Sequence, residues 1–122
     1  MAKIKDIDGK KFIWDRIRKK YVSLQPEELQ RQILIDILIE KYNYPLGLFS
    51  VETEIKVGKL KKRFDLLILD SLGYPLLLGE CKSENVRINK EALRQLMIYN
   101  KEIKSKILLL FNGNELYCWE LK

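Results

Sequence analysis

Two leucine-rich runs near the middle of the chain contain ionisable residues, and this combination constrains the possible folds most. The first run, FDLLILD at residues 64–70, contains Asp65, and the second, PLLLGECK at residues 75–82, contains Glu80 and Lys82. Uninterrupted apolar runs of this length predict strands that are covered on both faces of a sheet. Charged side chains at or near buried strand positions need a partner or a metal ion. We therefore expect these three side chains to mark a site between two neighbouring strands.

Two helices are predicted, one before and one after these strands. Pro26, followed by two acids, suits a first helical turn, and an apolar stripe continues the helix to about Tyr42. Asn89 is the predicted N-cap of a second helix that extends to Ile103. Before the first helix we expect only short extended pieces, and the polar and basic residues 1–11 are expected to be partly loose.

The remaining segments complete a predicted αβββαββ order. Strands are predicted at residues 48–57, 63–70, 75–82, 106–111 and 115–121. The Asn112-Gly113 pair predicts a turn between the last two strands. This order favours a single α/β domain of 122 residues, in which a central mixed sheet of about five strands is flanked by two main helices.

The composition excludes several kinds of site. The chain contains no histidine, which excludes Ser-His-Asp triads, Cys-His nucleophiles and His-ligated zinc. Its two cysteines, Cys81 and Cys118, have no metal-ligand spacing, and we expect small buried thiols. No apolar stretch approaches the length of a membrane span, and residues 1–5 lack the apolar core of a secretory signal. We therefore expect a cytoplasmic protein without membrane contact.

The charge balance favours an anionic partner. The chain has 23 Lys and Arg against 17 Asp and Glu, a net charge of +6. The basic residues gather in three clusters: Arg16, Arg18, Lys19 and Lys20; Lys56, Lys59, Lys61, Lys62 and Arg63; and Arg87, Lys90 and Arg94. The second and third clusters flank the strands that carry Asp65 and Glu80, so they are the more informative ones.

The two central strands allow a test of geometry. If residue 70 pairs with residue 75 across the loop, continuing the same register places Asp65 opposite Glu80. Opposed side chains in an antiparallel pair have Cβ atoms about 4.5–5.5 Å apart, and two carboxylates that close repel unless a cation or a proton lies between them. Glu80 and Lys82 share a strand face, with Cys81 on the other. A three-residue loop would shift this pairing by one position.

These residues would support magnesium chemistry on a phosphodiester. Mg²⁺ takes oxygen ligands and keeps several waters, and Asp65, Glu80 and the Cys81 carbonyl could supply the protein ligands for Mg²⁺ or Mn²⁺. Lys82 could hold or deprotonate the attacking water and stabilise the charge on the phosphate. The alternative is that acids and lysines at strand ends are surface residues that only cap the strands.

The order of several short motifs resembles that of a known nuclease superfamily. The motifs are Pro26-Glu27-Glu28 with Arg31-Gln32, Val51-Glu52, Lys61-Lys62-Arg63-Phe64-Asp65, Gly79-Glu80-Cys81-Lys82, and Gln95 with Tyr99-Asn100. Together they cover about residues 12–121 and resemble the PD-(D/E)XK nucleases, more specifically the N-terminal nuclease domain of type I restriction enzyme R subunits. The resemblance implies a restriction-endonuclease-like three-layer fold and a magnesium-dependent endodeoxyribonuclease.

The resemblance also implies roles for individual residues. Asp65, Glu80 and Lys82 match the catalytic core, and Glu28 resembles the first-helix acid that completes many such sites. Gln95 and Tyr99 resemble the QxxxY element of helicase-associated nucleases. Glu28, Gln95 and Tyr99 each have an alternative role. Glu28 could only stabilise the helix dipole, and Gln95 and Tyr99 could be a surface amide and a core tyrosine. Basic residues are expected to contact DNA phosphates, with little dependence on base sequence: Lys61, Lys62, Arg63, Arg87 and Arg94.

The sequence departs from the family pattern in two ways. Phe64 stands where the superfamily name has proline, and the chain has no phosphate-binding glycine loop of an ATP-driven motor. A homodimer or a partner motor or specificity subunit is therefore expected. The rival hypothesis is a non-catalytic nucleic-acid-binding or assembly domain that keeps the nuclease fold. Whether DNA or RNA is the substrate stays open at this stage.

Overall fold

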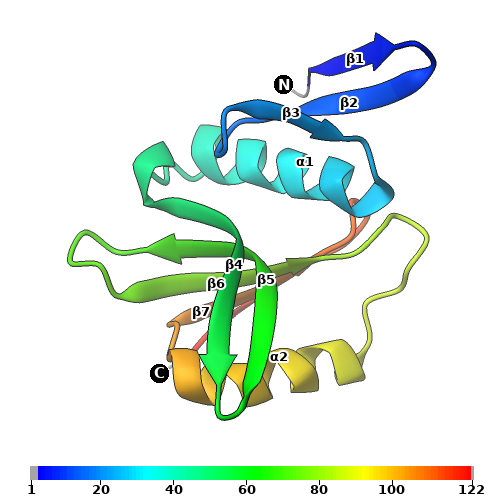
Figure 1. Cartoon of the computed structure of the whole chain (residues 1–122). Helices are drawn as coiled ribbons and strands as arrows, with labels where there is room; N and C mark the ends of the chain where they lie inside the picture. The colour runs from blue at the N-terminus through cyan, green and yellow to red at the C-terminus, as the bar shows by residue number, and fades with distance from the viewer. Residues whose placement is uncertain (1–2, 122) are drawn as a thin grey trace.

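A computed structural model describes residues 3–121, apart from the Val57 side chain, and places a five-stranded sheet at the centre of the chain (Figure 1). Its strands follow one another in space as they do in sequence: β4 (Phe49–Val57), β5 (Leu60–Leu69), β6 (Pro75–Cys81), β7 (Ile107–Phe111) and β8 (Leu116–Glu120). All neighbours are antiparallel except β6 and β7. This parallel pair is joined by α2 (Lys90–Ile103), because parallel neighbours need a crossover.

Helices cover both faces of this sheet, as the leucine-rich runs predicted. On one face, α1 (Pro26–Glu40) packs Leu34, Ile35 and Leu38 against the sheet. On the other face, α2 packs Leu96 and Ile103. Full burial of an apolar side chain contributes about 1.5–3 kcal/mol, so the two helices hold the sheet from both sides. The predicted αβββαββ order and mixed sheet are confirmed.

The helix ends follow their sequence signals. Pro26 lies in the first turn of α1, after an extended Gln25, and two acids follow it at the positive end of the helix dipole. The Asn89 side chain accepts a hydrogen bond of 2.9 Å from the Ala92 amide, which confirms the predicted cap of α2. At its other end, α2 stops at Lys104, which has left-handed backbone angles.

A second, three-stranded antiparallel sheet lies on the outer side of α1 (Figure 1). The sequence predicted only short extended pieces in the segment that forms it. Its strands are β1 (Ile4–Ile7), β2 (Lys10–Asp15) and β3 (Lys20–Ser23). Asp8 and Gly9 both have positive φ, so they form the tight turn that lets β1 pair with β2. Ile13 of β2 is fully buried. The predicted three-layer core is therefore extended by a fourth layer, and α1 lies between two sheets.

Both strands of the β4–β5 hairpin change the face that they present at one position. In β4, Val51 packs on the α1 side of the sheet, but Ile55 packs on the α2 side. In β5, Leu66 packs on the α1 side and Phe64 on the α2 side. If side chains alternated strictly between the two faces of the sheet, Val51 and Ile55 would share one face, and Phe64 and Leu66 would also share one face. The hairpin therefore twists where Glu52 and Asp65 lie, which brings its outer half beside α2.

The register of β5 and β6 agrees with the sequence prediction at its functional end. Leu66 pairs with Gly79, so the next position places Asp65 level with Glu80. The premise of that prediction is wrong, because Leu69, not residue 70, pairs with Pro75. A bulge after Ile68 restores the predicted pairing further along the strands.

Candidate active site

A cavity of about 270 Å³ opens beside Glu80, between the sheet and α2. It is lined by Lys62, Phe64, Glu80, Lys82, Ala92, Gln95, Leu96, Tyr99 and Leu110. Cys81, which lies between two of these residues in the chain, packs in the core on the α1 side instead. The prediction that Glu80 and Lys82 share a face, with Cys81 on the other, is therefore confirmed.

Asp65 lies at the twist of β5 and is held from two directions. Its Oδ1 accepts a hydrogen bond of 3.0 Å from Arg31 Nη2, and its Oδ2 accepts one of 2.8 Å from the Cys81 amide. Burial acts to raise the pKa of Asp65, but hydrogen bonds from Glu80 and the Cys81 amide, with the charge of Arg31, outweigh it and lower the pKa. Asp65 is therefore ionised at neutral pH.

Glu80 behaves in the opposite way. Burial, together with the hydrogen bond and the negative charge of Asp65, raises the pKa of Glu80 to about 9, while Lys62 and Lys82 act to lower it. Its Oε1 is buried and has no hydrogen-bond partner within residues 3–121. The two carboxyl groups therefore share one proton, as expected for acids brought this close without a cation between them.

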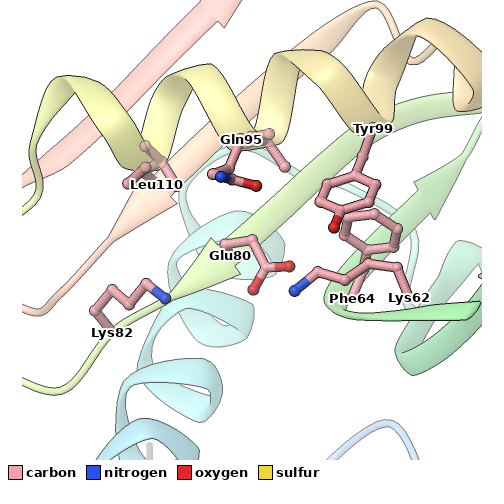
Figure 2. A pocket seen from close by; sticks show the side chains of 9 residues that line it. Lys62, Phe64, Glu80, Lys82, Gln95, Tyr99 and Leu110 are labelled. Carbon is pink, nitrogen blue, oxygen red and sulfur yellow. The ribbon is translucent and has the colours of Figure 1, made fainter. Parts of the chain in front are cut away.

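Two lysines lie on either side of the Glu80 carboxylate. Figure 2 shows the ammonium groups of Lys62 and Lys82 both directed towards it, from β5 and from the end of β6. The Lys62 ammonium also lies over the rings of Tyr99 and Phe64, 5.6 Å and 5.9 Å from their centroids. The sequence singled out Lys62 only as a phosphate contact. Its position two residues before the apolar Phe64 on a strand is the signal that could have placed it in the cavity.

Helix α2 supplies the upper wall of the cavity in Figure 2. Gln95 and Tyr99, one turn apart, reach towards the Glu80 side chain. Tyr99 packs edge-on against Phe64, with ring centroids 5.7 Å apart, and Gln95 Nε2 donates a long hydrogen bond of 3.4 Å to Glu91. Gln95 therefore lines the cavity with an exposed amide, and its role in catalysis stays a prediction.

Glu28 lies on the other side of the sheet, away from the cavity. Its Oε1 accepts hydrogen bonds from Arg31 Nη1 at 3.0 Å and Arg18 Nη2 at 3.2 Å. Its Oε2 accepts hydrogen bonds from Arg31 Nη1 at 3.3 Å and Gln32 Nε2 at 3.2 Å. Arg31 and Gln32 therefore share the helix face of Glu28, as the spacing predicted, and Glu28 reaches Asp65 only through Arg31.

Glu52 is the third acid bonded to this arginine. It accepts hydrogen bonds from Arg31 at 3.3 Å and from Arg18 at 3.0 Å. Its backbone is left-handed, with φ of 49°, which is unusual for glutamate and costs about 1–3 kcal/mol. This strained residue lies opposite Asp65 in the β4–β5 ladder. The strain is thus located at the twist that positions the acids.

Arg18 and Asp15 were not identified from the sequence as part of this site. Arg18 Nε is hydrogen-bonded to Asp15 Oδ2, and the fully buried Asp15 also accepts from the Ile17 amide at 2.8 Å. Asp15 is the last residue of β2, and Arg18 lies in the turn between β2 and β3. This segment has no nuclease-like motif. No sequence signal available from one chain links them to α1.

The predicted phosphate-contacting residues do not form one surface. Lys62 lines the cavity, whereas its neighbours Lys61 and Arg63 are exposed and alternate to the opposite face of the strand. Arg94 is also exposed and lines a separate groove on the outer side of α2. Arg87 is exposed in the loop before that helix. Their contacts with DNA stay a prediction.

The donors around the cavity fit a hard divalent ion. Among the described residues, no three His, Cys, Asp or Glu side chains gather as a ready-made metal cluster. Mg²⁺ needs only one or two carboxylates, because it keeps several waters. Asp65 is ionised, and Glu80 has a buried oxygen without a partner among the described residues. Both cysteines are free thiols, but the expectation that both are buried is wrong for Cys118, which is exposed. Two carboxyl groups that must otherwise share a proton form a suitable pair for such an ion.

The mixed sheet, its two covering helices and the acid and lysine side chains along β5 and at the end of β6 define a restriction-endonuclease-like fold. Comparison with known families matches residues 26–122 to the type I restriction enzyme R protein N terminus. The chain belongs to this family. No curated protein matches it. None of the described helices is long and apolar enough to span a membrane.

Proposed function

We propose that this chain is a magnesium-dependent endodeoxyribonuclease of the PD-(D/E)XK type. The observation that carries the proposal is geometric: Asp65 and Glu80 lie level on neighbouring strands, and Glu80, whose buried Oε1 has no partner among the described residues, lines a cavity together with Lys62 and Lys82. Carboxyl groups whose pKa values are driven apart beside a cavity are frequent at catalytic sites. Membership of a restriction enzyme family supports the same reaction class.

The side chains of Asp65 and Glu80, with the Cys81 carbonyl, would hold one Mg²⁺ or Mn²⁺. When bound, this ion supplies positive charge to the scissile phosphate and lowers the pKa of a coordinated water. Asp65 is already ionised and oriented by Arg31 and the Cys81 amide. Glu80 must first release its proton, which Lys62 and Lys82 favour by lowering its pKa.

Lys82 is the residue that we assign to the attacking water. Its ammonium faces the cavity beside Glu80, so it can orient the water and then stabilise the additional negative charge on the phosphate (Figure 2). Gln95 and Tyr99 can hydrogen-bond to phosphate or sugar oxygens from α2. The neighbouring exposed lysines and arginines would attract the DNA backbone, so binding is expected to weaken steeply with salt. We also propose that other subunits assist, as the family name implies.

The proposal is tested by incubating the chain with plasmid and linear DNA in the presence of Mg²⁺ or Mn²⁺. We expect metal-dependent cleavage that is lost in Asp65→Ala together with metal binding. Lys82→Ala is expected to lower cleavage by about 10²–10⁴-fold while it retains metal binding, because it removes only the group that acts on the water. The matched control is Lys106→Ala, an exposed lysine at the opposite end of β7.

Two results would count against the proposal. Metal-independent DNA retardation without cleavage, unchanged in Asp65→Ala, would favour a non-catalytic DNA-binding domain. Cleavage that persists in Asp65→Ala and Lys82→Ala would indicate a contaminating nuclease. Calorimetry with Mn²⁺ in the absence of DNA gives an independent measurement of the metal site.

A further inference from the structure

Arg31 occupies the point at which three acids converge on the α1 side of the sheet. Its Nη1 donates to Glu28 at 3.0 Å and 3.3 Å, and its Nη2 donates to Glu52 at 3.3 Å and to Asp65 at 3.0 Å. The Arg31 side chain is only 6% exposed. Four hydrogen bonds to three carboxylates thus surround one buried positive charge.

The acids of this group have few free positions for another ligand. Arg18 also donates to Glu28 at 3.2 Å and to Glu52 at 3.0 Å, and Gln32 donates to the second Glu28 oxygen. A guanidinium keeps its charge at all accessible pH values. A divalent ion placed among these three acids would therefore have to displace a permanent cation from a buried position.

The α1 side and the α2 side of Asp65 differ in whether a metal ion could bind without displacing an arginine. On the α1 side its Oδ1 is bonded to the Arg31 guanidinium, whereas on the α2 side lie the cavity and the unpartnered Glu80 oxygen. Glu28, which the sequence suggested as a first-helix acid completing the site, is bonded to Arg31, Arg18 and Gln32. It has the contacts of a residue that positions Arg31.

We propose that Arg31 takes the place of a second metal ion, so that the site binds a single divalent ion between Asp65 and Glu80. Glu28 and Glu52 are then positioning residues that fix the guanidinium and do not ligate metal. The inference rests on the proposed function, because it concerns the metal site of that function.

The direct test counts Mn²⁺ ions per chain by calorimetry and by electron paramagnetic resonance. The wild-type chain is expected to bind one Mn²⁺, with anomalous density in a Mn²⁺-soaked crystal between Asp65 and Glu80. A second peak at Glu28, with Arg31 displaced, would overturn the inference while leaving the nuclease proposal intact. Absence of any bound Mn²⁺ would overturn both.

Variants of Arg31 test whether its guanidinium takes the place of a second metal ion. Arg31→Met removes the charge but keeps an extended side chain, so it is expected to bind a second Mn²⁺ and to regain thermal stability when Mn²⁺ is added. Adding Glu28→Gln to this variant should remove the second ion again. Arg31→Lys keeps a cation and should bind one ion.

Arg16→Met is the matched control, since it removes an arginine that pairs with Asp36 and Glu40 on the same helix but away from the site. It should bind one Mn²⁺ and gain no stability from a second. A count of one ion in Arg31→Met, with folding retained, would contradict the inference. If Arg31→Met does not fold, the ion count and the metal position in the wild-type crystal decide.

Discussion

The acids on the α1 side of Asp65 and the acid on its α2 side differ in how their negative charge is neutralised. On the α1 side, Glu28 and Glu52 are neutralised by fixed guanidinium groups with hydrogen bonds on their oxygens. On the α2 side, Glu80 is left with a raised pKa, an unpartnered oxygen and two lysines that lie close but form no ion pair with it in the described chain. Buried polar groups are normally satisfied. Among the described residues, Arg31 Nε on the α1 side also has no partner, but Glu80 Oε1 is the unpartnered carboxylate oxygen, so it is the atom suited to bind a cation.

The comparison implies a separation between stability and activity. Residues of the α1 side are expected to be necessary for folding, and residues of the α2 side for binding and reaction. The four predictions below test this separation, from the largest expected effect to the smallest.

Glu80→Gln is expected to reduce DNA cleavage by more than about 100-fold, because loss of a direct metal ligand should exceed the 10–100-fold effect typical of residues behind the ligands. Glutamine has the shape of the protonated glutamate that the fold already accommodates. Thermal unfolding by circular dichroism should therefore stay at or above the wild-type temperature. A marked loss of stability would place Glu80 with the structural side of the comparison.

Arg31→Ala is expected to lower the free energy of unfolding by about 3–5 kcal/mol, since it leaves the buried Asp65 without an arginine partner and Glu28 and Glu52 with Arg18 alone. Urea unfolding measures the change. Arg16→Ala removes a more exposed arginine that pairs with α1 from the turn between β2 and β3, and it should cost no more than about 1 kcal/mol. Equal effects of the two substitutions would show that the network around Arg31 has no special role in folding.

The stability of the metal-free chain should fall as pH rises through the neutral range. The pKa of Glu80 is about 9 in the folded chain against an ordinary value of 4.5, so between these values the folded state binds the additional proton. The free energy of unfolding is then expected to fall by about 2–3 kcal/mol between pH 5 and pH 7. Subtracting the pH profile of Glu80→Gln isolates this contribution, and an identical profile in the variant would contradict the assigned pKa.

Lys62→Ala is expected to lower cleavage by about tenfold, the effect of losing one hydrogen bond to a charged group. It should also raise the pKa of Glu80, because the positive charge of Lys62 lowers that pKa. The fall in metal-free stability still begins near the ordinary pKa of glutamate, but the pH at which it ends should move upward. Lys106→Ala, which removes an exposed lysine at the far end of β7, is the control and should change neither property.

The sequence predicted the central sheet well because its signals are local. The leucine runs, the proline at the start of α1 and the Asn89 cap each act within a few residues, and the observed elements follow them. The pairing of β5 with β6 was predicted at the level of Asp65 and Glu80, although through a loop that differs by one position.

The remaining features depend on contacts between distant segments. Hydrogen bonds from Arg18 to Glu28 and Glu52 join residues that no periodic pattern relates. The twist at Glu52 and Asp65 breaks the strand alternation on which face assignments depend. Counting from Leu66 would therefore place Lys62 on the α1 side, and only its spacing from Phe64 indicates the cavity. Tertiary contacts determined these features.

The N-terminal sheet has a consequence for how the family match is used. The matched segment begins at Pro26, whereas Arg18, which lies beside the acids of α1 and β4, belongs to the preceding sheet region. A protein engineer who transplants only the shared core would therefore leave behind half of the guanidinium charge around Glu28 and Glu52. The segment that has to be transferred to keep this network intact is therefore longer than the segment that matches the family.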